Sequence, residues 1–262
     1  MKKFSLAELR LLKKIALKIP GAYKCFIYAE NQLRYFFRKN KILSFYANFI
    51  NKGDLCFDIG ANVGSKTKIF LELGAQVVAV EPQDYCMQQL QKQFEKNNKV
   101  KLVKMACGEK LGTTELMLCD NYRSSSISKE WINIMKNSRR FSVFNWRGRE
   151  KVHIITLDEL IRNYGKPTFC KIDVEGYELE VIKGLSKPVK YMSFEFNSEC
   201  VDIALNCIQY LFGIGVRNFN YSIDETMELV SPEWFNIEEI RKALLSLPKG
   251  ISMGDIYTKL DN

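Results

Sequence analysis

The chain has 262 residues, of which 47% are hydrophobic and 26% are charged, enough for one sizeable buried core and an enzyme-sized domain. One histidine and eight cysteines without a C-x-x-C pair argue against His-rich metal centres, zinc fingers and disulfide frameworks. Charged residues interrupt the first apolar runs and no apolar run reaches about 18 residues, so neither a signal peptide nor a membrane span is expected, and the predicted location is cytoplasmic.

Basic charge is concentrated at the start of the chain. The formal net charge is +9, and residues 1–50 account for all of it, because eleven Lys and Arg residues there face only Glu8 and Glu30. Apolar spacing predicts helices over residues 4–19, 23–37 and 42–50. Residues 1–50 are therefore expected to form a basic helical extension. It either packs as a cap on the main domain or, through residues 1–41, contacts a partner or the anionic inner surface of a membrane.

From residue 51 onward, short apolar runs alternate with helical patterns, which is typical of βαβ units. Strands are expected at Leu55–Ile59, Gln76–Glu81, Val100–Ala106, Phe169–Asp173, Tyr191–Phe196, near Val216–Tyr221 and at Asp255–Thr258. Helices are expected at Lys66–Leu73, Met87–Lys96, Leu157–Tyr164, Glu178–Lys183 and Ala204–Phe212. This order predicts a Rossmann-like α/β domain over residues 51–262, with a mostly parallel seven-stranded sheet.

An insertion interrupts the alternation between the third and fourth predicted strands, at about residues 120–151. About sixty residues separate these strands, far more than a crossover helix needs. The insertion is basic, and Trp131 and Trp146 are interleaved with its charges. Its candidate acceptor-binding residues are Arg139, Arg140, Arg147 and Arg149. They form either a lid that binds an anionic sugar or a phosphate-linked carrier, or a solvated loop.

The segment DIGANVG, residues 58–64, follows the first predicted strand and opens a helix. Its glycines allow a sharp turn and close approach to a ligand, at the strand end where open α/β sheets bind their ligands. Glu81 ends the next strand, and a carboxylate there can accept protons from both hydroxyls of a ribose. These features predict a nucleoside ligand. The dinucleotide fingerprint G-x-G-x-x-G is missing because Asn62 stands in the loop, so a pyrophosphate would be held poorly.

The segment KIDVEGYE, residues 171–178, stands at the end of the fourth predicted strand. Strand alternation places Lys171, Asp173 and Glu175 on one side if the extended backbone continues that far. Burying charged groups at a ligand-binding edge costs free energy unless they form ion pairs or take part in binding or catalysis. These three are therefore candidate catalytic residues. The alternative is a structural ion pair between Lys171 and Asp173. One acidic pair does not establish a metal site, and no metal is assigned.

Several motifs together resemble the FkbM family of methyltransferases. They are DIGANVG, VEP at 80–82, the Ala-Cys-Gly step at 106–108, TLDEL at 156–160, KIDVEGYE and GDIY at 254–257. They cover about residues 53–258, and KIDVEG is the most specific of them. The N-terminal helices and the insertion lie outside the resemblance.

The resemblance implies a class I methyltransferase fold and S-adenosylmethionine as the methyl donor. The residues implied for the donor are Asp58, Gly60, Ala61, Asn62, Gly64, Glu81 and Pro82, with Ala106 and Cys107 beside the adenine. The implied acceptor is a hydroxyl of a sugar, glycan or related natural product, and Asp173 or Glu175 is expected to orient or deprotonate it.

Two alternatives to this function stay open. The basic surfaces and interleaved aromatic residues suggest a nucleic-acid methyltransferase, although the chain lacks an N-P-P-Y motif and a Pro-Cys nucleophile. A non-catalytic nucleoside-binding scaffold is the second alternative. The intact acids Asp58, Glu81, Asp173 and Glu175 argue against it.

Overall fold

The computed structural model describes residues 39–138, 143–224, 226–250 and 252–261. The chain divides into two compact units, Met1–Ser44 and Phe45–Asn262, and this division lies before the boundary expected at residue 50. The helices expected over 4–19 and 23–37 lie outside the described residues, and the helix expected over 42–50 ends at residue 46. No helix in the described part of the chain is long and apolar enough to cross a membrane.

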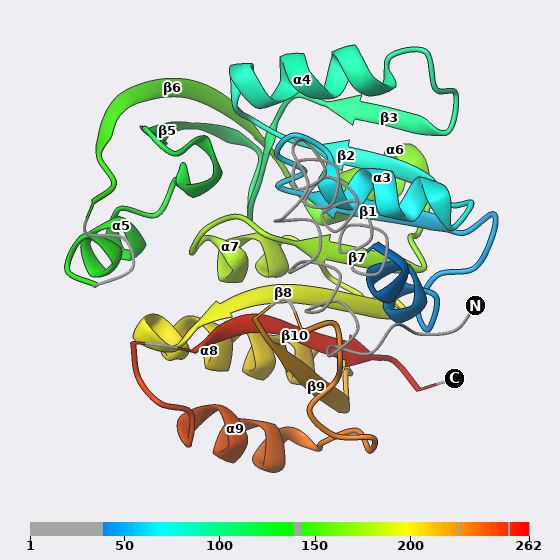
Figure 1. Cartoon of the computed structure of the whole chain (residues 1–262), viewed down its shortest axis with the longest axis vertical. Helices are drawn as coiled ribbons and strands as arrows, with labels where there is room; N and C mark the ends of the chain where they lie inside the picture. Colours follow the sequence, from blue (N-terminus) through cyan, green and yellow to red (C-terminus); the bar gives the residue numbers. More distant parts are fainter. Residues whose placement is uncertain (1–38, 139–142, 225, 251, 262) are drawn as a thin grey trace, which may run out of the picture. The chain divides into compact units, whose positions relative to one another are not determined.

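A seven-stranded sheet forms the centre of the second unit (Figure 1). Its strands are β1 (Leu55–Ile59), β2 (Gln76–Val80), β3 (Val100–Val103), β7 (Phe169–Ile172), β8 (Tyr191–Asn197), β9 (Asn218–Ile223) and β10 (Met253–Lys259). They lie in the order β3-β2-β1-β7-β8-β10-β9, and β10 is antiparallel to both of its neighbours while the other pairs are parallel. The predicted Rossmann-like α/β fold with a mostly parallel seven-stranded sheet is confirmed. Because β1 and β7 are neighbours, the two motifs that follow them meet at one sheet edge.

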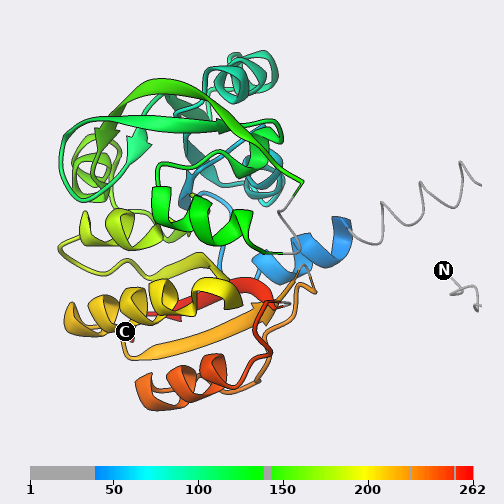
Figure 2. The same cartoon turned by 90° about the vertical axis from the view of Figure 1, so that its left-hand side faces the viewer.

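Helices connect these strands. They are α3 (Ser65–Glu72), α4 (Asp84–Phe94), α5 (Lys129–Lys136), α6 (Leu157–Tyr164), α7 (Glu178–Lys183), α8 (Val201–Gly213) and α9 (Ile237–Leu245). The predicted bounds of α6 and α7 are confirmed, and α8 contacts both α7 and α9 (Figure 2). The sequence prediction missed α9, although Asn236 and Glu239 form a capping box at its start.

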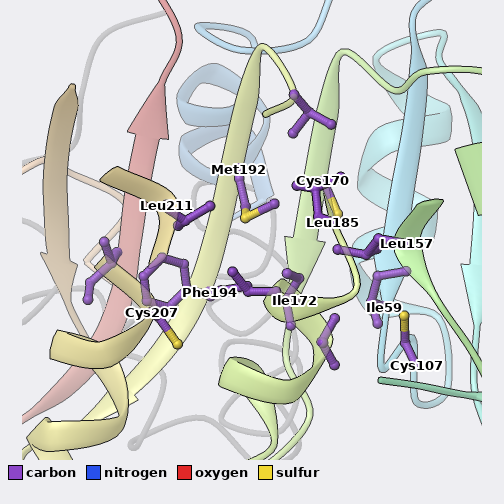
Figure 3. Packing of buried hydrophobic residues seen from close by; sticks show 14 of the residues in the cluster. Ile59, Cys107, Leu157, Cys170, Ile172, Leu185, Met192, Phe194, Cys207 and Leu211 are labelled. Carbon is purple, nitrogen blue, oxygen red and sulfur yellow. The ribbon is translucent and has the colours of Figure 1, made fainter. Parts of the chain in front are cut away.

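The two faces of the sheet differ in character. On one face Cys170, Ile172 and Phe194 join the main apolar cluster, which residues of α6, α7 and α8 complete (Figure 3). On the opposite face Phe169 packs edge-on against Phe70 of α3, with ring centroids 5.6 Å apart. Because side chains alternate along a strand, Lys171 lies on the face of Phe169. The sheet therefore presents its buried charge on the α3 face.

The segment between β3 and α6, which includes the predicted insertion, contains a second sheet and a helix. The strands β4 (Ala106–Cys107), β6 (Trp146–Ile155) and β5 (Gly112–Cys119) lie in the order β4-β6-β5, and a short 3-10 helix, η1 (Tyr122–Ser124), precedes α5. The third strand predicted over 100–106 is wrong at its end: β3 stops at Val103, and Ala106 pairs with Ile154 of β6 instead. Trp131 and Trp146 of the insertion are buried in a small apolar cluster that also includes Cys200, so this cluster joins the insertion to the start of α8.

Candidate functional site

The loop after β1 is held tightly against the ends of β2 and β7. Gly60 has φ +77°, and its amide and that of Ala61 donate hydrogen bonds to the Val80 carbonyl at 2.9 and 3.0 Å. A Cβ atom at Gly60 would lie 1.9 Å from the Asp173 carbonyl oxygen, so only glycine fits there. The glycine of the DIGANVG motif therefore lets the loop after β1 come into direct backbone contact with the end of β7.

Glu81 ties this loop to the segment that follows β2. Its Oε2 oxygen accepts a hydrogen bond from the Asn62 amide and its Oε1 oxygen accepts one from the Gln83 amide, both at 2.8 Å. The residue is only 6% exposed, and burial raises the pKa of its carboxyl to about 7. Each carboxylate oxygen still has a lone pair for another donor.

A cavity, here called the edge cavity, opens at this point. Predicted donor residues that line it are Gly60, Asn62, Glu81, Pro82, Ala106 and Cys107. Three others do not line it: Ala61, Gly64 and Asp58. Asp58 is 1% exposed and accepts a hydrogen bond from the Thr67 hydroxyl, so it joins β1 to α3 beneath the loop.

The predicted catalytic residues meet at the same edge. Lys171 is 2% exposed, and its Nζ atom lies 3.2 Å from Asp173 Oδ2 and 3.1 Å from Asp255 Oδ1. The alternation of side chains along β7 does not extend to Glu175 as the sequence suggested, because β7 ends at Ile172 and Glu175 adopts φ +55°. A turn brings Glu175 to the cavity instead, and both Asp173 and Glu175 line it.

Glu195 of β8 completes a group that the sequence did not reveal. Carboxylate oxygens of Asp173, Glu175 and Glu195 lie within 4.8 Å of one another, and we call these three residues the carboxylate cluster. Burial, and then the neighbouring acids, raise the pKa values of Glu175 and Glu195 well above their usual range. In the sequence, the sign of this group is a single acid, Glu195, inside the apolar run Tyr191–Phe196, and that run predicts a strand and not a site.

The insertion supports the turn that carries Glu175. The Ser126 hydroxyl donates a 2.6 Å hydrogen bond to the Glu175 carbonyl. Trp131 packs against Gly176 so closely that a Cβ atom there would lie 2.2 Å from the indole. Both contacts come from the segment that precedes and begins α5, so this segment helps to shape the site.

Of the arginines predicted to bind the acceptor, Arg147 and Arg149 are not among the described residues that line the edge cavity. Arg147 and Arg149 are exposed on β6, and Arg149 forms an ion pair with Glu115 at 3.2 Å. Arg139 and Arg140 lie outside the described residues. Arg123, together with Tyr122, comes from η1 and lines the cavity, and the sequence prediction did not single these two out.

Comparison with known proteins shows which family the sequence matches. Residues 58–211 match the family described as the Methyltransferase FkbM domain. A search of curated proteins found no match. Among solved structures, a precorrin-6y C5,15-methyltransferase from Geobacter metallireducens is 12% identical, with 85% of this chain and 87% of that protein covered and a TM-score of 0.46. Fibrillarin from Aeropyrum pernix with bound S-adenosyl-L-methionine is 11% identical, with 80% and 68% covered and a TM-score of 0.41.

Proposed function

Because the chain belongs to the FkbM methyltransferase family, we propose that it methylates a hydroxyl group of a sugar, a glycan or a related natural product. The family match covers more than half of the chain and makes the protein an S-adenosylmethionine-dependent methyltransferase. The observation that carries the choice of a hydroxyl is the carboxylate cluster beside the edge cavity. A hydroxyl must lose its proton when its oxygen is methylated, and a carboxylate of this cluster can accept that proton.

The residues around the edge cavity fit the donor. Glu81 keeps one lone pair on each oxygen for the two ribose hydroxyls, and Gly60 and Asn62 bring backbone close to the ligand. Ala106 and Cys107 line the cavity with small side chains, which leaves space for the adenine. When bound, S-adenosylmethionine supplies an electrophilic methyl group on its sulfonium sulfur.

Glu175 is the proposed proton acceptor. Burial raises the pKa of its carboxyl, so its carboxylate is a stronger base than one in water. The acceptor oxygen bonds to the methyl carbon as the carbon–sulfur bond breaks, and the hydroxyl proton moves to Glu175 before it reaches solvent. Lys171 holds Asp173 at 3.2 Å, and Asp173 is the proposed partner that orients the acceptor hydroxyl.

A second concave surface, here called the side groove, is the proposed place for the rest of the acceptor. It has a volume of about 880 Å³ and shares Ile127 and Tyr177 with the edge cavity. The charged residues of its described lining are Glu115, Lys129, Glu130, Lys151, Glu180 and Asp202. Acids outnumber lysines, and Thr113, Thr114 and Asn206 add neutral hydrogen-bonding groups. This lining supports a polyhydroxyl acceptor without a strong negative charge, in contrast to the anionic acceptor that a lid formed by the arginines of the insertion would bind.

A product assay tests the proposed function. The full chain is incubated with S-adenosylmethionine carrying a labelled methyl group and with neutral oligosaccharides, glycolipids, charged sugars, RNA and DNA. We expect the labelled methyl group to appear in a sugar-containing fraction. The label should resist mild base, as a methyl ether does and a methyl ester does not. Label in RNA or DNA alone would overturn the proposal and favour the nucleic-acid alternative. Donor binding without transfer to any of these acceptors would favour the non-catalytic scaffold.

Donor binding should depend on pH through Glu81. The pKa of this carboxyl is about 7, and the ionised form accepts the ribose hydrogen bonds, so lowering the pH through 7 removes the favourable form. We expect the Kd of S-adenosylhomocysteine to rise about tenfold between pH 8 and pH 6, as one proton competes with the ligand. Calorimetric titration measures this change. Glu81→Gln should bind more weakly with a nearly flat profile, and an equally steep profile in this variant would assign the titration to another group.

A further inference from the structure

When ionised, the three acids of the carboxylate cluster carry more negative charge than the described residues around them balance. Asp173, Glu175 and Glu195 come from the end of β7, the following turn and β8, and they converge within 4.8 Å. Like charges held at this distance in a partly buried site raise the free energy of the folded protein unless a proton or a cation neutralises them. Among the described residues, Lys171 forms an ion pair with Asp173 of this group, and it already shares its ammonium with Asp255.

Glu195 lacks the hydrogen bonds that would explain its position. Its Oε2 oxygen is buried and has no hydrogen-bond partner among the described residues. The nearby Glu178 differs, because its Oε1 oxygen accepts hydrogen bonds from the Val174 and Gly176 amides, both at 3.2 Å. An orphaned buried carboxylate oxygen is rare in folded proteins and calls for a partner. Its neighbours are two further carboxylates, so a cation bound between the three acids would supply the partner that this oxygen lacks.

We propose that the carboxylate cluster binds one divalent cation of the Mg²⁺ or Mn²⁺ type. Each of the three residues offers one carboxylate oxygen to the ion. An all-oxygen set of this kind suits hard cations, whereas zinc sites normally include nitrogen or sulfur ligands. Three protein oxygens leave coordination positions for water and for one exogenous oxygen. All three residues keep some solvent exposure, so a hydrated ion has a route to the site.

The cation would act at the acceptor, and this part rests on the proposed function. Asp173 and Glu175 line the edge cavity, so an ion on the cluster stands at its wall. A hydroxyl that takes an open coordination position loses its proton more readily, because the ion stabilises the alkoxide. One oxygen of Glu175 would bind the ion and the other would receive the proton. With the ion present, the increased acidity of the coordinated hydroxyl would take the place of a raised pKa of Glu175 in driving this transfer. The cluster thus combines activation of the hydroxyl with its deprotonation.

Manganese binding to the full chain tests the site without any turnover. Mn²⁺ is titrated into the protein, and free ion is followed by electron paramagnetic resonance in the absence of donor and acceptor. We expect one saturable Mn²⁺ site per chain, displaced by Mg²⁺. Glu195→Gln should weaken it by at least about tenfold, since even indirect changes at metal sites have effects of this size. Glu238→Gln, on the exposed start of α9, is the matched control and should bind Mn²⁺ as the wild type does.

Parallel titration with S-adenosylhomocysteine separates this inference from the proposed function. Glu195→Gln is expected to bind the nucleoside normally, which also shows that the variant is folded. Saturable Mn²⁺ binding that persists in the presence of S-adenosylhomocysteine supports the cation site. Loss of Mn²⁺ when the nucleoside binds would assign the acids to the donor's own ammonium group and overturn the inference. Normal nucleoside binding with no saturable Mn²⁺ site in the millimolar range would also overturn it, and the methyltransferase function would stand.

Discussion

Gly60→Ala is expected to remove donor binding and to lower the free energy of unfolding by about 4 kcal/mol or more. The added Cβ atom would lie 1.9 Å from the Asp173 carbonyl oxygen and 2.9 Å from the Asp173 carbonyl carbon. Backbone atoms cannot rotate away, so the ends of β1 and β7 must separate. Alanine also disfavours φ +77°, which adds about 1 kcal/mol of strain. The separation would displace the loop and Asp173 together, and both line the edge cavity.

Urea unfolding and calorimetric titration with S-adenosylhomocysteine measure the two effects of this change. Gly53→Ala is the matched control, because Gly53 has φ +92° and no atom lies within 4 Å of the position that an added Cβ atom would take. Gly53→Ala therefore has the unfavourable φ angle without the steric clash. It should lower the free energy of unfolding by about 1 kcal/mol and leave donor binding intact. Equal losses of stability in the two variants would show that the close approach of β1 and β7 is not rigid.

Glu175→Gln is expected to lower kcat for methyl transfer by about 10²- to 10⁴-fold, the usual contribution of a general base. The amide has the shape of the carboxylate but cannot accept the hydroxyl proton. The backbone of the turn should persist, because the Ser126 hydroxyl bonds to the Glu175 carbonyl and not to its side chain. Affinity for S-adenosylhomocysteine should therefore stay near that of the wild type.

Initial rates of labelled methyl transfer, measured with saturating donor and Mg²⁺, test this expectation. The rate of the wild type should fall at low pH as the base is protonated, and the residual rate of Glu175→Gln should lack that dependence. Glu95→Gln, an exposed acid after α4, is the control for the loss of one carboxylate. A Glu175→Gln rate near that of the wild type would remove Glu175 from the proton-transfer step and leave Asp173 as the base.

The agreement between sequence and structure is closest where a pattern is local. The bounds of β1, α6 and α7 were predicted to the residue, because each has a regular apolar period and a clear start or stop signal. Disagreement is largest between β3 and α6. There β4 leaves the path expected for the third strand and pairs with Ile154 of β6, a partner that is distant in sequence. Such pairing depends on contacts that no short window of sequence contains.

The α/β fold, the family and the positions of residues 58–64 and Glu81 at the ends of β1 and β2 could all be predicted from the sequence, because turns, strand ends and motif spacing are encoded by neighbouring residues. Tertiary packing was needed to show which distant groups share one site. It added Glu195 from β8 to Asp173 and Glu175, and Arg123 to the edge cavity. It also placed Arg149 in an ion pair with Glu115 on an exposed strand. The physical reason is that charge interactions depend on distance in space and on burial, and both arise only when the sheet and the insertion have packed.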